Sequence, residues 1–359
     1  MSKRFLIWYW SPTGGGGSQY AVKLAQRLAR RFGEDAVTLS LHADDPSLAK
    51  APAYAFETLS AKVITARRRP IGTATNLPAS AQVLAQHAAR ADCVVAPMNF
   101  AAAALLAIGL QKPLVYVAHD PKPHPGDYAP LWQRATQAAL LRKSTRIVAL
   151  SNYAARELTR LTDTRGKLQV VPLSAVFEPQ EAAPRREGPL RLLFAGRMIA
   201  YKGLDILADA LPRLAQRDDW RLTIVGAGPA LDAAMARRFE LPQVERVSSD
   251  WLSEAELENL IADCDIVLAP YRSATQSGVV AQAFAHAKPC VVTPVGALGE
   301  QIGGDIGGWV AEAADASAFA AALVRALGSA EEMQAKQAGA LALARAAWQH
   351  DYWRWLEEM

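Results

Sequence analysis

The segment from residue 191 to residue 228 constrains the fold of this chain more than any other. Residues 191–195 form an apolar run that ends at Gly196, leucines recur at helical spacing between residues 204 and 211, and residues 221–225 form a second apolar run. This order predicts a strand, a helix and another strand. Such a βαβ unit builds a parallel sheet, and open parallel sheets bind ligands beyond the carboxyl ends of their strands.

The turn after the first of these strands carries two cations. Arg197 follows Gly196, and Lys202 precedes Gly203. Glycines let backbone amides approach a ligand, and fixed positive charges beside them suit a diphosphate. The same residues also fit a solvated turn without a ligand, so this pattern leaves both interpretations open.

The segment resembles the donor-binding signature of retaining glycosyltransferases of family 4, which have the GT-B fold. In that family a Gly-Arg pair and a following Lys-Gly pair hold the diphosphate of a nucleotide sugar, which implies this role for Arg197 and Lys202. The N-terminal half matches in outline only, whereas the resemblance covers most of residues 188–325. It continues through three further stretches, which are residues 226–229, 249–252 and 276–289.

The resemblance implies a donor site assembled from several loops of the C-terminal half. Gly226 and Gly228 would bring backbone past the base and ribose, or would make only a tight turn from strand to helix. Trp251 and Leu252 would border the base. Amides at the start of a helix would bind the diphosphate, because helix N-termini attract anions. The other implied donor-binding residues are Gly196, Thr275, Gln276, Ser277, Gly278, Val279 and Gln282.

Two positions depart from the family pattern. Gln282 stands where a glutamate usually holds the ribose hydroxyls, and Ala274 stands where the other glutamate of the pair lies. An amide oxygen still accepts a hydrogen bond, at a loss of about 1 kcal/mol relative to a carboxylate. Ala274 offers no polar group, so Thr275 or Gln276 would contact the sugar and donor choice would be unusual. A non-catalytic nucleotide-sugar-binding protein would also explain the missing carboxylates.

A glycine-rich loop follows the first predicted strand. Gly14 to Gly17 stand between the apolar run 4–10 and a helix whose apolar face includes Leu24 and Leu28. The loop lacks the spacing and the ribose-binding acid of a dinucleotide fingerprint, and it is not a Walker loop. In the resembling family this loop faces the sugar donor and the acceptor. That implies substrate contacts from Gly15, Gly16 and Gly17, the alternative being a purely structural turn.

His119 is the third candidate catalytic residue, beside Arg197 and Lys202. It follows the apolar run 114–118, the second of three short buried runs that predict parallel strands. In resembling enzymes a histidine after this strand contacts a sugar hydroxyl; otherwise it would fix the loop backbone. The proline-rich loop beyond it also contains His124, and Ser151 after the third run is a predicted helix N-cap.

Length and composition favour a two-domain α/β protein. The 359 residues are 51% hydrophobic and include a Pro- and Gly-containing linker near residues 178–189. The fold that the resemblance implies is GT-B: two Rossmann-like domains with parallel sheets facing across a cleft. The acceptor domain is residues 1–182 and the donor domain residues 189–333. A final helix, residues 334–359, crosses back onto the N-terminal domain in that fold, although its dense aromatics would also suit a lipid interface.

The two halves of the chain have opposite charge. Residues 1–180 hold 22 Lys and Arg against 11 Asp and Glu, a net charge of +11, and the remainder hold 17 against 24, a net charge of −7. The basic half, in which Arg67 to Arg69 are the densest cluster, predicts an anionic partner or only scattered solvated faces. An anionic membrane surface is one such partner. The chain shows no nucleic-acid-reading motif.

Cysteines and apolar runs favour a cytoplasmic location, and the basic half would allow peripheral contact with the inner face of the plasma membrane. Cys93, Cys264 and Cys290 are odd in number and lie in or beside strand-like runs, which argues against disulfides. The longest apolar run, residues 100–110, is shorter than the roughly 20 residues that span a bilayer.

The resemblance implies a retaining glycosyltransferase. Because fixed cations would neutralise the charge of the diphosphate, we expect it to need neither a metal ion nor a cofactor. It would move a hexose from a UDP- or GDP-linked donor to a saccharide or lipid-linked acceptor, in cell-envelope polysaccharide synthesis. The acids of Asp263-Cys264-Asp265 resemble a metal-binding motif, but they straddle a helix end and a strand, where capping and solvation are the better interpretation. A nicotinamide dehydrogenase is disfavoured because the Gly226-Ala227-Gly228 turn lacks a third glycine and a ribose acid.

Overall fold

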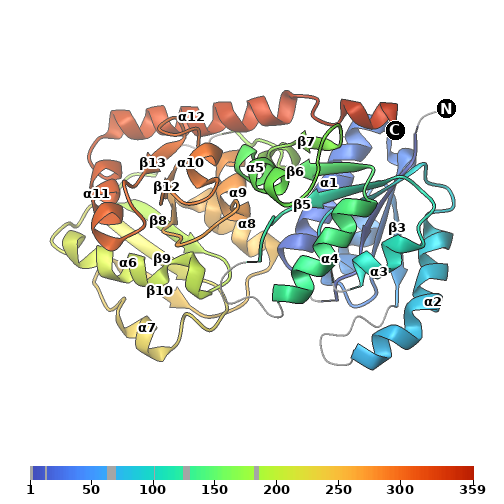
Figure 1. Ribbon diagram of the computed structural model, residues 1–359. Helices are drawn as coiled ribbons and strands as arrows, with labels where there is room; N and C mark the ends of the chain where they lie inside the picture. Colours follow the sequence, from blue (N-terminus) through green and yellow to red (C-terminus); the bar gives the residue numbers. More distant parts are fainter. Residues whose placement is uncertain (1–2, 13, 63–69, 101, 124–129, 182–185) are drawn as a thin grey trace. The chain divides into compact units, whose positions relative to one another are not determined.

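The computed structural model describes residues 3–12, 14–62, 70–100, 102–123, 130–181 and 186–359 (Figure 1). The chain forms two compact units. Among the described residues, the first unit contains those up to Pro123, residues 130–171 and Asp351–Met359, and the second contains residues 172–350. The cluster Arg67 to Arg69 and His124 lie outside the described residues.

A parallel sheet forms the centre of the first unit, with seven strands in the described ranges, in the order β3-β2-β1-β4-β5-β6-β7 (blue to green in Figure 1). The strand order reverses where β1 pairs with β4, which makes this the topological switch point. The strands are β1 (Phe5–Tyr9), β2 (Val37–His42), β3 (Glu57–Ala61), β4 (Cys93–Ala96), β5 (Leu114–Ala118), β6 (Arg146–Ala149) and β7 (Leu168–Val170). The helices are α1 (Gly16–Phe32), α2 (Pro70–His87), α3 (Ala103–Ile108), α4 (Pro130–Lys143) and α5 (Asn152–Leu161), with 3-10 turns η1 (Glu34–Ala36), η2 (Pro46–Ala53) and η6 (Arg354–Glu358).

The second unit repeats this architecture. Within the described residues its sheet has six parallel strands in the order β10-β9-β8-β11-β12-β13, with the switch point between β8 and β11. The strands are β8 (Leu190–Ala195), β9 (Trp220–Val225), β10 (Val244–Ser248), β11 (Ile266–Ala269), β12 (Cys290–Val292) and β13 (Gly308–Val310). The helices are α6 (Leu204–Ala210), α7 (Ala233–Arg237), α8 (Glu254–Asp263), α9 (Gly278–Ala285), α10 (Leu298–Gln301), α11 (Ala316–Ala326) and α12 (Ala330–Gln349), with η3 (Leu173–Val176), η4 (Ala200–Lys202) and η5 (Leu211–Leu214). The predicted α/β class with two parallel sheets is confirmed.

Strand residues of the second unit alternate between two cores. Leu192 and Phe194 of β8 pack in a cluster with residues of α6 and α11, whereas Leu193 and Ala195 pack in another with residues of α8, α9 and α12. Successive side chains of a strand point to opposite faces, so both faces of this sheet are covered. This explains why the strands read as continuous apolar runs.

Serine residues cap the N-termini of two helices. Ser151 accepts a hydrogen bond from the amide of Ala154 and caps α5, as predicted. Ser253 and Glu256 form a capping box at the start of α8. These caps satisfy amides that have no acceptor within the helix.

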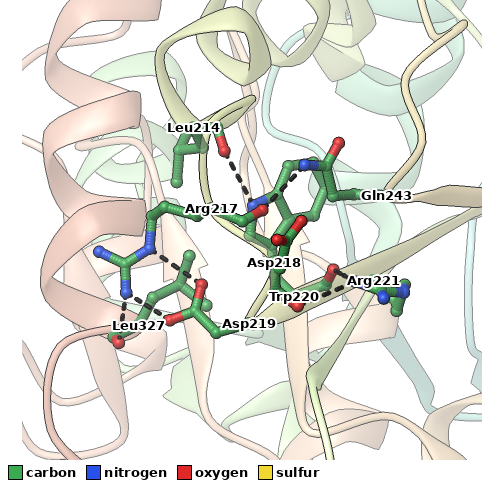
Figure 2. A network of polar contacts seen from close by, with 8 residues as sticks. All are labelled: Leu214, Arg217, Asp218, Asp219, Trp220, Arg221, Gln243 and Leu327. Atoms are coloured by element: carbon green, nitrogen blue, oxygen red, sulfur yellow. Dashed lines mark hydrogen bonds and ion pairs between the residues drawn. The ribbon is translucent and has the colours of Figure 1, made fainter.

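A polar network closes the turn before β9, at the end of the sheet opposite the predicted donor site (Figure 2). The amide of Gln243 donates to the carbonyls of Ala215 and Arg217, at 2.9 and 2.8 Å. The indole of Trp220 donates to Leu214, and the guanidinium of Arg217 donates to Leu327. Arg217 also donates to the carboxylate of Asp219, with Nε at 2.9 Å from Oδ1. Because the acceptors are backbone carbonyls and a neighbouring carboxylate, the network is a structural clamp on the turn.

Two parts of the chain differ from the expected element pattern. The region between β2 and β4 contains β3 and α2, neither of which was predicted from the sequence. The final helix was expected to run to the C-terminus, but α12 ends at Gln349 and belongs to the second unit. The last nine residues belong to the first unit, where Arg31 of α1 pairs with Asp351 at 2.8 Å and with Glu357 at 2.6 Å.

The N-terminal part of the first unit ends at Val171, whereas the sequence placed the end of the N-terminal domain at residue 182. The reason is that η3, which follows Pro172, packs on α9 and α12. Within the described part of the chain, no helix has the length and apolar character needed to cross a membrane.

Candidate functional site

The loop after β8 lies at the switch point of the second sheet. Gly196 adopts a positive φ of 120°, and a side chain at this position would lie 3.7 Å from Cγ2 of Val279. Val279 is in the first turn of α9, so the backbone that carries Arg197 runs directly beside the start of that helix. Arg197 itself is exposed, and its Nη2 donates to the hydroxyl of Tyr201 at 3.4 Å.

Gly226 and Gly228 are glycines because neighbouring backbone comes too close for a side chain. A Cβ on Gly226 would lie 1.8 Å from the carbonyl oxygen of Gly196, and one on Gly228 would lie 2.2 Å from that of Met198. The amide of Met198 also donates to the carbonyl of Ala227 at 2.8 Å. The two glycines therefore hold the Arg197 loop in place, and their predicted contacts with base and ribose stay a prediction.

Lys202 is held beside α9 by a tyrosine that follows β11. Its Nζ donates to the hydroxyl of Tyr271 at 2.6 Å, and this hydroxyl lies 3.1 Å from Oγ of Ser277. The next residue, Gly203, has a φ of 69°, and a Cβ there would lie 1.8 Å from the carbonyl oxygen of Pro270. This close approach of two loops places Lys202 over the aromatic ring, 3.9 Å from its centroid.

The start of α9 corrects one prediction. The amide of Ser277 was expected to be free for a diphosphate, but it donates to Oε1 of Gln301 at 2.9 Å. Nε2 of the same glutamine donates back to the carbonyl of Ser277 at 2.7 Å. Ser277 caps the helix instead, by accepting from the amide of Val280. The amides of Gly278 and Val279 stand in the first turn, where an α-helix provides no acceptor for them.

The electrostatics of this region are dominated by fixed cations and a neutral phenol. Burial raises the pKa of Tyr271 to about 12, with the charge of Arg197 and the hydrogen bond with Ser277 acting in the opposite direction. Tyr271 therefore keeps its proton at pH 7 and can donate one hydrogen bond. The charges of Lys202, Arg197 and the positive end of α9 would each favour an anion, as predicted for a diphosphate.

The residues predicted to contact the sugar and ribose lie before and within α9. Ala274 and Thr275 are buried, and Gln276 and Gln282 are half-buried. The carbonyl of Ala274 packs against Gly296, where a Cβ would lie 1.5 Å from its oxygen. At Ala274, where the resemblance implies a glutamate, the loop before α9 is therefore held by a backbone contact.

Trp251 and Leu252 follow β10, the edge strand of the sheet. Trp251 is 61% exposed, and Leu252 is half-buried against the α8 and α9 core. β10 is two strands from β8, a separation of roughly 10 Å at 4.8 Å per strand. To contact the base, as predicted, Trp251 and Leu252 require a ligand that extends roughly 10 Å from the cations after β8. A nucleoside attached to a diphosphate extends in this way.

In the first unit, the glycine loop caps the start of α1. Gly15 is the N-cap, with a φ of 87°. A Cβ on Gly17 would lie 2.2 Å from the hydroxyl of Tyr9, so this glycine is explained by packing. At Gly16, by contrast, a Cβ would have no described heavy atom within 4 Å. Of the three glycines predicted to contact substrate, Gly15 therefore has an unusual backbone conformation and Gly16 has open space around it.

His119 is almost completely buried after β5. Its ring meets that of Tyr20 from α1 edge to face, with 4.5 Å between the centroids. Burial lowers the pKa of His119 to about 4, opposed by the charge of Asp120 and by a hydrogen bond with the backbone of Pro97. The imidazole is neutral at pH 7. The contact with Pro97 agrees with the loop-fixing alternative, and the predicted contact with a sugar hydroxyl stays a prediction.

The two acids of Asp263-Cys264-Asp265 both have protein partners, one a backbone amide and the other an arginine at the surface. Asp265 is buried and accepts from the amide of Arg191 at 2.8 Å, so its predicted solvation was wrong. Asp263 pairs with Arg186 at 2.8 Å. Among the described residues, no cluster of three or more His, Cys, Asp or Glu side chains is arranged to hold a metal ion. The three cysteines are free and buried.

A cavity of about 600 Å³ lies beside the loops that carry Lys202 and Gly228. Tyr201, Leu204 and Met235 are part of its mainly apolar wall, and Arg272 and Arg238 contribute charge. Both arginines are already paired, with Asp205 and Asp209 respectively. None of the predicted site residues lines this cavity.

Comparison with known proteins identifies the family. Residues 14–174 match the model of Glycosyltransferase Family 4, and residues 189–329 match that of Glycosyl transferases group 1. Together the two matches cover most of the chain. The chain belongs to the family 4 glycosyltransferases. The resemblance seen in the Arg197 and Lys202 motifs is thereby confirmed at the level of the family.

Three similar proteins illustrate the relationship. An uncharacterized glycosyltransferase of Methanocaldococcus jannaschii is 30% identical over 121 residues, which is 33% of this chain and 31% of that protein. Glycogen synthase of Mycobacterium tuberculosis is 29% identical over 174 residues, or 47% of this chain and 42% of that protein. The match thus spans less than half of either relative. The Anabaena protein HepE, solved with UDP and glucose, has a TM-score of 0.72 at 17% identity, covering 97% of this chain and 95% of that chain. This likeness confirms the GT-B fold of the family 4 enzymes.

Sequence reasoning missed two residues of this site, Tyr271 and Gln301. Tyr271 stands two residues beyond β11, at the carboxyl end of a strand, and that position could have singled it out. Gln301 lies on the short helix α10 in no motif. Only the folded chain brings it to Ser277.

Proposed function

We propose that this chain is a glycosyltransferase that transfers a hexose from a nucleoside diphosphate sugar, with UDP as the nucleotide. The observation that carries the proposal is the anion site at the switch point of the second unit, where Lys202 lies beside the first turn of α9. Membership of family 4 supports the reaction class. The solved HepE structures contain UDP or UDP-glucose, which supports the choice of nucleotide.

In this proposal the cations stabilise the leaving diphosphate. When the bond between the anomeric carbon and the phosphate oxygen breaks, negative charge grows on that oxygen. Arg197, Lys202 and the amides of Gly278 and Val279 are fixed donors toward this charge. They supply the stabilisation for which other transferases use a metal ion, so transfer would continue in EDTA. Attack by the acceptor hydroxyl on the same face, with its proton passing to the departing phosphate oxygen, would give the retention that is expected for the family.

A nucleotide panel tests the donor. Thermal unfolding of the full chain is measured with UDP, GDP and ADP, and UDP is expected to raise Tm most. A ligand at 100 times its Kd adds about 2.7 kcal/mol to the free energy of unfolding. Failure of all three nucleotides to shift Tm would contradict a nucleotide-sugar site, and a larger shift with GDP would overturn the choice of UDP. UDP binding without hexose transfer from UDP-sugars to saccharide or lipid-extract acceptors would favour the non-catalytic alternative.

For the acceptor, we propose a saccharide or lipid-linked saccharide of the cell envelope, bound by the basic first unit. Apolar side chains are exposed on two helices of this unit that pack on each other, Ile108 on α3 and Leu131 and Trp132 on α4. Arg134 is exposed on α4. Apolar and cationic side chains together suit the surface of an anionic membrane, where each cation near the surface adds about 1 kcal/mol of attraction.

Flotation with liposomes tests this membrane contact. The protein is expected to float with vesicles of phosphatidylglycerol and phosphatidylcholine, and to float less at high salt, because screening weakens the attraction. Trp132→Ala should reduce flotation, whereas Trp251→Ala, which removes an exposed tryptophan from the second unit, should not. Equal recovery with neutral and anionic vesicles would refute an anionic membrane partner.

A further inference from the structure

Tyr271 occupies an unusual position for a buried tyrosine. The side chain is 2% exposed, yet its hydroxyl reaches the ammonium of Lys202 at 2.6 Å and Oγ of Ser277 at 3.1 Å. The first partner is a candidate ligand of the diphosphate, and the second is the cap of α9. One hydroxyl therefore connects the two parts of the anion site.

The direction of the first hydrogen bond follows from the groups themselves. An ammonium has only donors, so Lys202 donates and the oxygen of Tyr271 accepts. The hydroxyls of Tyr271 and Ser277 are each able to donate to the other, and Oγ of Ser277 also accepts from the amide of Val280. A chain of hydrogen bonds therefore connects the ammonium of Lys202 with the cap of α9.

Both ends of this chain are fixed to backbone. Gln301 holds the amide and the carbonyl of Ser277 with two hydrogen bonds. Gly203, next to Lys202, packs against the carbonyl of Pro270, next to Tyr271. The distance between the ammonium and α9 is therefore set by the fold and not by the ligand.

We propose that Tyr271 is a positioning residue that holds the ammonium of Lys202 beside the amides of Gly278 and Val279, so that the diphosphate meets a preformed site. A lysine side chain has many rotamers, and fixing it before the ligand arrives removes an entropy cost from binding. This inference rests on the proposed function, because it assumes that Lys202 binds the diphosphate.

The variant Tyr271→Phe tests the inference, because it removes one oxygen and keeps the ring. The Kd for UDP, measured by titration calorimetry on the full chain, is expected to rise about 10-fold or more, as a hydrogen bond with a charged group is lost. Tyr116→Phe is the matched control. Tyr116 is equally buried, at 2%, but it lies in β5 of the first unit, so its variant should bind UDP as the wild type does.

A double-mutant cycle separates positioning from a general structural role. If Tyr271 acts through Lys202, then Tyr271→Phe should change the Kd for UDP little in a protein that already carries Lys202→Met. A merely structural tyrosine would instead weaken binding equally in both backgrounds and would lower Tm. Wild-type affinity in Tyr271→Phe would overturn the inference while leaving the proposed function intact, whereas absence of UDP binding in the wild type would overturn the proposed function itself.

Discussion

Replacement of Lys202 by methionine, or of Arg197 by alanine, is expected to lower kcat for sugar transfer about 10²- to 10³-fold. The reason is that, in the proposed reaction, both cations would face charge that develops as the glycosyl–phosphate bond breaks. A group that acts on the transition state lowers kcat when it is removed, whereas a group that only binds substrate raises KM. Methionine keeps most of the apolar stem of Lys202 over the ring of Tyr271, so the fold of the loop should survive.

The measurement is steady-state transfer from UDP-hexose, with Tm recorded for each variant. Arg213→Ala is the matched control, because Arg213 is an exposed cation of the same unit in η5, beyond the far end of α6 from Lys202. It should leave kcat and KM unchanged. The two site variants should retain the wild-type Tm within a few degrees. Unchanged kcat in both would show that the departing diphosphate is stabilised elsewhere, and the proposed site would be wrong.

The fold could be predicted because burial leaves a simple pattern. Both sheets are parallel and covered on both faces, so their strands are short apolar runs such as residues 114–118 and 221–225. β3 was missed because it is an edge strand, and its sequence Glu57 to Ala61 is mostly polar or half-exposed. Edge strands are buried on fewer sides, so they need fewer apolar residues and give a weaker signal.

The cations of the site could be predicted from the sequence, but their surroundings could not. Arg197 and Lys202 stand in a local motif whose spacing is fixed by one turn. Tyr271 and Gln301, by contrast, are 69 and 24 residues from their partners Lys202 and Ser277 along the chain. No pattern in the sequence shows that a glutamine of α10 will take the amide of Ser277, because this depends on how α10 packs beside α9.

Two positions of the proposed donor site carry no carboxylate. Ala274 and Gln282 stand where the family resemblance implies glutamates for the sugar and the ribose. Under the proposed function, most of the binding energy would then come from the diphosphate. Lys202 and the residues that position it would therefore matter more for binding than in a protein that also holds the ribose with a carboxylate.

Acid is expected to destabilise this protein through His119, by about 3 kcal/mol between pH 6.5 and pH 4. The pKa of this histidine is about 4 in the folded chain, because burial disfavours the imidazolium, and about 6.5 when the chain is unfolded. Between these values the unfolded state binds a proton that the folded state does not. The free energy of unfolding therefore falls as pH falls, by about 1.4 kcal/mol per pH unit. The contribution is fully present above pH 6.5 and is lost by pH 4.

Urea unfolding of wild type and of His119→Gln at several pH values isolates the contribution of His119 to the pH dependence of the free energy of unfolding. The variant should be less stable than wild type at pH 7.5, because a buried ring and its contact with Tyr20 are lost, but the difference should shrink as the pH approaches 4. His350→Gln is the control, since His350 is exposed at the end of α12, and it should leave the slope of stability against pH unchanged. Parallel curves for wild type and His119→Gln would mean that the imidazole reaches solvent in the folded protein. In that case His119 would titrate near neutral pH and could exchange a proton with a bound sugar. If the stability difference between wild type and His119→Gln shrinks as the pH falls, His119 is neutral in the folded protein and can act on a sugar only through hydrogen bonds.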